Sequence, residues 1–510
     1  MLGTWAATAA ELQLTIRDAA TGRAVPARVR VRTPEGHDVV PVGAVGIPLR
    51  EDRWFASPGT SVLQVPAGEI DLRVERGKEY VPAKVKLTAK PGGPTRHTVK
   101  LRRWIDMERL GYVSGENHIH VALSDLPAVL AADDMDYGSS LYWWNGPNLP
   151  KPEGAESVRT LSFGGESVSA SVFDAEVEQE WGPAYLIGLT SPLPPDKDPA
   201  SPNLRYLKEG RRQGALLCYN AGWAREALVD ALAGYVDVVD ICNNLFLRHR
   251  FLPRKGYSNV LGVEGLPQYE ETPAGMLQMN LDAYYRMLNC GLRVAAGADS
   301  AVGAKATPVG YNRAYVRAKK GAPLADFLDA WRRGRNFVTN GPMVFLESGS
   351  HGPGDVVDLP SAGKSVRLRA RAMSDEPLKS LELVANGEVI ARASIRPGDR
   401  SAGLSHTLTV SEGTWVAARC SDEEMLLSDE ELARYRRPPG RPAEEPSRLR
   451  FGHTSPIYLT VAGRPVRVAK SVEEARRIVD AFERFARGKS GDRFAAEVQP
   501  MIEAARSRLQ

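Results

Sequence analysis

The sequence has few cysteines and no long apolar run, and these shortages exclude several classes of protein. Only 4 of its 510 residues are cysteine, and no Cys-x-x-Cys pair occurs. This argues against a zinc knuckle or a redox dithiol, and a chain of this length needs no disulfide scaffold. No apolar run approaches the roughly 18 residues of a membrane-spanning helix, so we expect no membrane span.

Neither acidic nor basic residues are in large excess. The net charge is +4, with acidic and basic residues mixed along the chain. Because no basic stripe is separated from the acids, we expect no nucleic-acid partner. The first ten residues are apolar without a basic start, so they are not a complete signal peptide. A periplasmic or secreted location is expected only if a signal peptide precedes this sequence.

Alternating apolar and polar residues predict β-sandwiches at two places. Residues 11–103 contain period-2 segments such as Leu12 to Arg17 and Ala27 to Arg32, which predict a first small sandwich. The pattern returns over 345–468, for example from Val366 to Arg371, and predicts a second one. For 469–510 we expect an amphipathic helical tail that opens with a capping box at Ser471.

The middle segment, 104–344, has a different pattern. Short apolar runs alternate there with helical periodicity, which favours βα units in a mainly parallel sheet or barrel. In such folds the chemistry lies at the carboxyl ends of the strands. The predicted strands are Gly111–Ile119, Ser139–Trp143, Ala184–Leu189, Gly214–Tyr219, Val236–Ile241 and Leu292–Ala296.

The stretch Gly115-Glu116-Asn117-His118-Ile119-His120 is the first candidate site. It contains the only close histidine pair among 8 histidines. In a strand, residues i and i+2 point to the same face, so the two imidazoles would lie side by side. Imidazole is the commonest side-chain metal ligand. The pair therefore indicates either a metal site or two histidines that hydrogen-bond at a strand end.

Other polar residues follow predicted strands. We expect them to gather at the same edge as the histidine pair, or else to cap helices and form turns. They are Asn145, Asn220, Asp240, Asn243, Asn244 and Asp299.

With these residues in view, the chain resembles the CehA/McbA-type (carbaryl-hydrolase-like) branch of the PHP metallohydrolase superfamily. The resemblance extends from about Ala19 to Val466. Its most specific stretch is Gly334-Arg335-Asn336-Phe337-Val338-Thr339-Asn340-Gly341-Pro342. Further stretches are Val25-Pro26-Ala27-Arg28-Val29, the segment from Trp104 to His120, Gly310-Tyr311-Asn312-Arg313, and His453-Thr454-Ser455-Pro456.

The resemblance implies an α/β fold: a distorted PHP-type β/α barrel flanked by the two sandwiches. It also implies hydrolysis of an ester, carbamate or phosphoester at a divalent zinc, manganese or iron ion. His118 and His120 match the first metal motif, and Asp299 matches the last. Glu176 resembles the metal-bridging acid, with Glu178 and Glu180 as neighbouring alternatives.

Three departures from the family pattern reduce the expected metal site. Pro183, Asn220 and Ala301 stand where the family has histidine, so we expect one metal ion rather than several. His249 is a candidate replacement ligand or acid–base group, or else a surface residue. Arg313 is a candidate for holding an anionic substrate group, or else a buried donor to loop carbonyls.

Two functions follow as expectations. The first is a metal-dependent hydrolase of a small molecule that acts through a metal-activated water. The second is a catalytically inactive barrel that serves as a carbohydrate- or protein-binding module. The retained histidine pair favours the first, and the three missing histidines favour the second.

Overall fold

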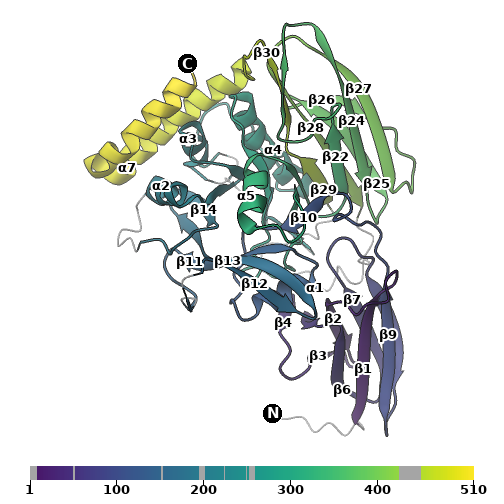
Figure 1. Cartoon of the computed structure of the whole chain (residues 1–510). Helices are drawn as coiled ribbons and strands as arrows, with labels where there is room; N and C mark the ends of the chain where they lie inside the picture. The colour runs from purple at the N-terminus through teal and green to yellow at the C-terminus, as the bar shows by residue number, and fades with distance from the viewer. Residues whose placement is uncertain are drawn as a thin grey trace.

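The computed structural model of the chain is shown in Figure 1. The structure describes residues 9–49, 52–150, 153–154, 156–194, 202–222, 224–248, 250–251, 259–423 and 449–510. Within these residues the fold is mixed α/β, with several sheets and a long carboxyl-terminal helix. No described helix is both long and apolar enough to cross a membrane.

The amino-terminal part packs two sheets face to face. One has the strand order β6-β1-β9 and the other β4-β5-β2-β7-β8, with β3 on β2. The alternation expected for β1 is observed, because Leu12, Leu14 and Ile16 are buried between the sheets. The strands are β1 (Ala9–Asp18), β2 (Ala27–Arg32), β3 (Asp38–Val39), β4 (Gly46–Leu49), β5 (Asp52–Ser57), β6 (Thr60–Pro66), β7 (Gly68–Glu75), β8 (Ala83–Ala89) and β9 (Pro94–Leu101).

The middle part is built on one mixed sheet with the order β19-β16-β15-β14-β13-β11-β10-β20-β21. Its strands are β10 (Tyr112–Gly115), β11 (Tyr137–Trp144), β12 (Val158–Phe163), β13 (Glu166–Gln179), β14 (Gly182–Ile187), β15 (Leu216–Asn220), β16 (Val238–Cys242), β19 (Ala295–Ala298), β20 (Arg313–Arg317) and β21 (Asn336–Thr339). A small separate ladder joins β17 (Phe246–Leu247) and β18 (Arg250–Phe251).

The expectation of a mainly parallel sheet is only partly correct. β10–β11, β11–β13, β15–β16 and β16–β19 are parallel, whereas β13–β14, β14–β15 and β10–β20 are antiparallel. The β13–β14 pair is antiparallel because the chain returns from β13 into β14 through a tight turn. The long β12–β13 hairpin was not predicted. Side chains join the two ends of the sheet, since Asn336 of β21 donates to Ala296 O of β19 at 2.8 Å.

Helices pack against this sheet in Figure 1. They are α1 (Leu126–Ala132), α2 (Asn203–Gln213), α3 (Ala227–Leu232), α4 (Pro273–Asn289) and α5 (Leu324–Arg332). The final helix, α7 (Ala469–Arg508), lies beside α3 and α4 and joins the same core, where Phe482 makes an edge contact with Trp181.

The start of α7 differs from the expected capping box. The helix begins at Ala469, and its N-cap is Val468, three residues before Ser471, with no side-chain cap. Ser471 is instead inside the first turn, and its hydroxyl accepts a hydrogen bond from Asn289 Nδ2 at 3.0 Å. A tertiary contact to α4 has therefore replaced the local cap.

The carboxyl-terminal strands form a second sandwich. A sheet of order β22-β24-β27 packs on strands that extend the middle sheet, because β21 pairs with β29. The strands are β22 (Met343–Glu347), β23 (Val356–Leu359), β24 (Lys364–Met373), β25 (Leu378–Ala385), β26 (Glu388–Arg392), β27 (Ser401–Val410), β28 (Thr414–Glu423), β29 (Leu449–Thr454) and β30 (Ile457–Val461). A hydrogen-bonded sheet thus crosses the predicted boundary near residue 344.

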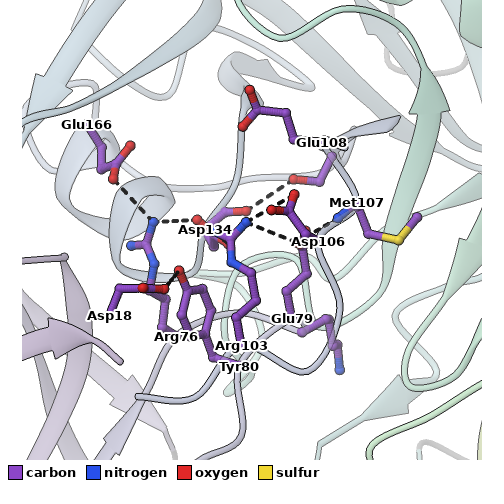
Figure 2. A network of polar contacts seen from close by, with 12 residues as sticks. Asp18, Arg76, Glu79, Tyr80, Arg103, Asp106, Met107, Glu108, Asp134 and Glu166 are labelled. Atoms are coloured by element: carbon purple, nitrogen blue, oxygen red, sulfur yellow. Dashed lines mark hydrogen bonds and ion pairs between the residues drawn. The ribbon is translucent and has the colours of Figure 1, made fainter. Parts of the chain in front are cut away.

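Buried ion pairs join the first sandwich to the middle part. Figure 2 shows Asp134, just after α1, between Arg76 of the sandwich and Arg103 of the linker. Arg103 also lies 3.7 Å from Glu79, whose carboxylate accepts from Met107 N at 3.0 Å. Because these groups come from three separate segments, the network fixes the linker against both parts.

Candidate metal centre

Three side-chain atoms converge at the edge of the middle sheet. His118 Nε2 lies 2.8 Å from His120 Nε2, and Glu176 Oε2 lies 3.1 Å from the first and 3.0 Å from the second. Tetrahedral zinc with bonds near 2.0–2.2 Å places its ligand atoms roughly 3.3–3.6 Å apart. The three atoms are slightly closer than that, so one ion fits after a small outward adjustment. Among the described residues they are the only such group of three.

Backbone contacts hold the two histidines just after β10. His120 N donates to Val302 O at 2.8 Å, and Ile119 between the two histidines is fully buried. This extended segment directs both imidazoles to one side, as the His-x-His spacing predicts. Their ring centroids are 4.8 Å apart.

The register of β13 selects Glu176 from its acidic neighbours. Glu176 pairs with Trp144 of β11 and is buried, whereas Glu178 accepts from the Trp144 indole at 3.0 Å at the surface. Glu180 lies beyond the strand and forms an exposed ion pair with Lys489. Only Glu176 of these three reaches the histidines.

Asp299, the fourth ligand expected from the sequence, lies outside the group of three converging atoms. Its Oδ1 lies 3.2 Å from His118 Nδ1, on the opposite side of the ring from the other two ligand atoms. A carboxylate at that position orients a metal-ligating histidine and fixes its tautomer. Asp299 is itself held by Asn244 N at 3.1 Å and Asn220 Nδ2 at 3.2 Å.

The electrostatics of the cluster favour a bound cation. Burial opposes the charged imidazole, but Glu176 and Asp299 outweigh it and raise the pKa of His118 to about 10. Burial also opposes the charged carboxylate of Glu176, yet His118 and His120 lower its pKa to about 2. The acids thus favour positive charge between these side chains, which either a proton or a divalent ion can supply.

Further buried carboxyl groups surround the centre. Burial raises the pKa of Glu116 to about 8 and that of Asp240 well above its usual range. Within the described part of the chain, neither of them, nor Glu176 or Asp299, forms an ion pair with arginine or lysine. The centre therefore has an excess of acid over basic side chains.

The asparagines predicted at strand ends have different roles. Asn243 Nδ2 donates to Asn220 Oδ1 at 2.8 Å, so these two and Asn244 form a chain that ends on Asp299. Asn117 Nδ2 donates to Asp240 Oδ1 at 2.9 Å. Asn145 instead forms a turn with φ of 53° and accepts from Glu178 N, which is the simpler alternative.

Arg313 is a structural donor rather than part of the centre. It is buried, and its guanidinium donates to the carbonyls of Gly310, Asp133 and Asp134. These bonds agree with the alternative of a buried donor to loop carbonyls, and binding of a substrate anion by Arg313 stays a prediction. His249, the predicted replacement ligand or acid–base group, lies outside the described residues.

Two aromatic residues at the centre were not assigned to it from sequence. The Tyr185 ring lies 4.4 Å from that of His118, and nothing in its surrounding apolar run marked it. Trp144 has 42% of its surface exposed and contacts His120 edge-on, with ring centroids 4.9 Å apart. Trp143 is buried against Tyr206 and belongs to the core.

Comparisons with known proteins do not place the chain in a family. No protein-family model and no curated protein matches it. Among solved structures, a minor pilin of Streptococcus agalactiae matches with 14% identity and a TM-score of 0.17, over 20% of this chain and 47% of the pilin. The Bacillus anthracis TIE protein matches with 20% identity and a TM-score of 0.15, over 23% of this chain and 20% of that protein.

Proposed function

We propose that the chain is a metal-dependent hydrolase of the PHP type, similar to the CehA/McbA-like enzymes, with a single divalent ion. Its substrate would be a small ester, carbamate or phosphoester. The observation that carries the proposal is the convergence of His118, His120 and Glu176, with Asp299 behind His118. Two histidines and one acid are a donor set that zinc, manganese and iron all accept.

The chain's own residues have defined tasks in this proposal. His118, His120 and Glu176 hold the ion, and Asp299 keeps His118 Nε2 directed toward it. When bound, such an ion lowers the pKa of a water and polarises the substrate's carbonyl or phosphoryl oxygen. Three protein ligands leave a coordination position for that water. Trp144 offers an apolar, exposed surface beside His120 for the substrate.

The proposed distorted β/α barrel is consistent with the arrangement of the centre. The histidines follow β10, and Asp299 follows β19, which is the strand-end placement expected of such folds. The side-chain link between β19 and β21 brings the sheet's two ends together. The antiparallel pairs of β14 would be the distortion.

Metal content and turnover together test the proposal. Purified protein should contain about one equivalent of metal, and His118→Ala/His120→Ala should contain none. His97→Ala/His351→Ala, which changes two histidines remote from the centre in sequence, should keep the metal. An ester, carbamate and phosphoester panel should show turnover that is lost with the metal.

Two results would count against the proposal in different ways. No metal in the wild type after reconstitution, or equal turnover by the His118→Ala/His120→Ala variant, would exclude the metal-dependent mechanism. One bound metal with no turnover on the panel would favour the binding module. The specific observation behind that alternative is that Asn220 and Ala301 supply no metal ligand at the positions where the family has histidine.

A further inference from the structure

A second pocket lies apart from the metal centre, between α3, α4, α7 and the segment 259–269. Its empty space, open solvent at the mouth included, is about 740 Å³. His118, His120 and Glu176 are absent from its lining. Asn220 separates the two sites, because it lines this pocket while its Nδ2 donates to Asp299.

The lining is mainly apolar. Leu228 of α3, Met279 and Ala283 of α4, and Ile478 of α7 contribute to it, together with Leu261 from the covering segment. Because these residues come from four separate parts of the chain, tertiary packing forms the pocket. Because their side chains are apolar, its interior is apolar. Such an interior fits an alkyl or aromatic group.

The charges at the pocket have one sign. Arg225 and Arg286 line it, and no aspartate or glutamate occurs among the described lining residues. Arg286 is paired with Glu474 at 2.9 Å. Arg225 is half-buried, donates to the carbonyl of Glu180 and lies over the Phe485 ring, and no carboxylate of the described residues pairs with its guanidinium.

We propose that this pocket binds an amphipathic organic anion, with its apolar body between α3, α4 and α7 and its carboxylate or sulfonate at Arg225. The apolar lining accounts for the body, and the unneutralised guanidinium accounts for the head group. The proposal does not rest on the hydrolase proposal, because none of the three proposed metal ligands lines the pocket.

A pair of fluorescent probes tests both parts of the ligand. 1-Anilinonaphthalene-8-sulfonate carries the anion, and N-phenyl-1-naphthylamine has the same aromatic body without it. Both should bind the full-length protein with saturable fluorescence enhancement. Ala283→Trp fills the pocket and should weaken both probes at least about tenfold, whereas Ala504→Trp on the exposed face of α7 should change neither.

Arg225→Ala distinguishes the contribution of the anionic head group to binding from that of the apolar body. It should weaken the sulfonate probe about tenfold and leave the neutral probe unchanged, because only the charge-assisted contact is lost. The His118→Ala/His120→Ala variant should bind both probes as the wild type does, so failure of the hydrolase proposal leaves this test intact.

Three results would overturn the proposal. They are no saturable binding by the wild type, equal binding by a natively folded Ala283→Trp variant, and equal loss of both probes in Arg225→Ala. Circular dichroism and thermal unfolding of each variant establish whether it is folded.

Discussion

Glu75 and Glu116 are the same residue type and are almost equally buried, yet their pKa values move in opposite directions. Burial raises both. Around Glu75, however, the guanidinium groups of Arg248, Arg28 and Arg73 outweigh burial and hold its pKa well below the usual range. Glu116 has no such partner among the described residues, and its pKa rises to about 8.

The junction around Glu75 and the centre around Glu116 therefore differ in how their buried charges are compensated. At the junction between the first sandwich and the middle part, arginines are built in, and four of them surround the Trp54 ring at 5.7–5.9 Å. At the centre the acids outnumber the basic groups that face them. The arginines balance the acids at the junction, whereas at the centre the proposed cation would supply the balancing charge.

Breaking the junction should have the largest effect. Glu75→Gln leaves buried arginine charges without their shared partner, so we expect a loss of about 3–5 kcal/mol in the free energy of unfolding. Urea denaturation measures it. Glu69→Gln, which breaks an exposed pair with Lys86, should cost about 0.5 kcal/mol or less. A loss below about 1 kcal/mol for Glu75→Gln would contradict the charge-balance explanation.

Glu226 provides a third case, a buried acid with neither an arginine nor a place in the centre. Burial raises its pKa to about 8, above the 4.5 of an ordinary glutamate, so its contribution to stability falls as pH rises between these values. Glu226→Gln removes this fall, and Gln can still accept from Asn203 N. Relative to wild type, we expect the variant to gain roughly 3–4 kcal/mol between pH 5 and pH 8.

Urea denaturation at the two pH values provides the measurement for Glu226→Gln. Parallel changes in wild type and variant would show that Glu226 is not held protonated. Glu209→Gln is a suitable control, since Glu209 is near the surface and its pKa is lowered to about 2 by its hydrogen bonds with Arg212 and Gln213.

Adding the cation should stabilise the protein through binding at the centre. Zinc at about 100 times its dissociation constant should raise the free energy of unfolding by about 2.7 kcal/mol. Chelation should reverse the change, and thermal unfolding with and without zinc measures it. The His118→Ala/His120→Ala variant should show no zinc-dependent shift; a shift as large as that of the wild type would place zinc elsewhere.

Asp299→Asn should produce the smallest effect of the four predicted changes. The three ligand atoms remain, but the carboxylate that orients His118 is lost, so metal affinity should fall about 10- to 100-fold. Competition with a chromophoric chelator gives the affinity. Asp329→Asn, at an exposed pair with Arg333, is the matched control. Complete loss of metal would instead indicate that Asp299 is a direct ligand.

Local patterns predicted the parts of the fold that depend on local chemistry. The period-2 segments became β1, β2 and β24, and in β1 and β24 the alternation also identified the buried face. The antiparallel pairing of β14 was missed, since strand direction depends on which strand lies alongside, and an apolar run does not encode that.

The residues of the candidate site also fall into those that local sequence predicted and those that required the tertiary structure. His118 and His120 could be found from sequence because their spacing alone sets them on one side of an extended segment. The choice of Glu176 over Glu178 required the register of β13 against β11. The position of Asp299 behind His118, and the use of Arg313 as a loop donor, required the packing of segments over a hundred residues apart.

The sequence by itself determined the alternation of the sandwich strands and the paired imidazoles, because both follow from backbone geometry over a few residues. Only the tertiary structure decided which acid reaches the histidines and which buried acids receive an arginine. Those outcomes depend on distances between residues far apart in the chain, and the free energy of a buried charge is set by the groups that lie within a few ångströms of it.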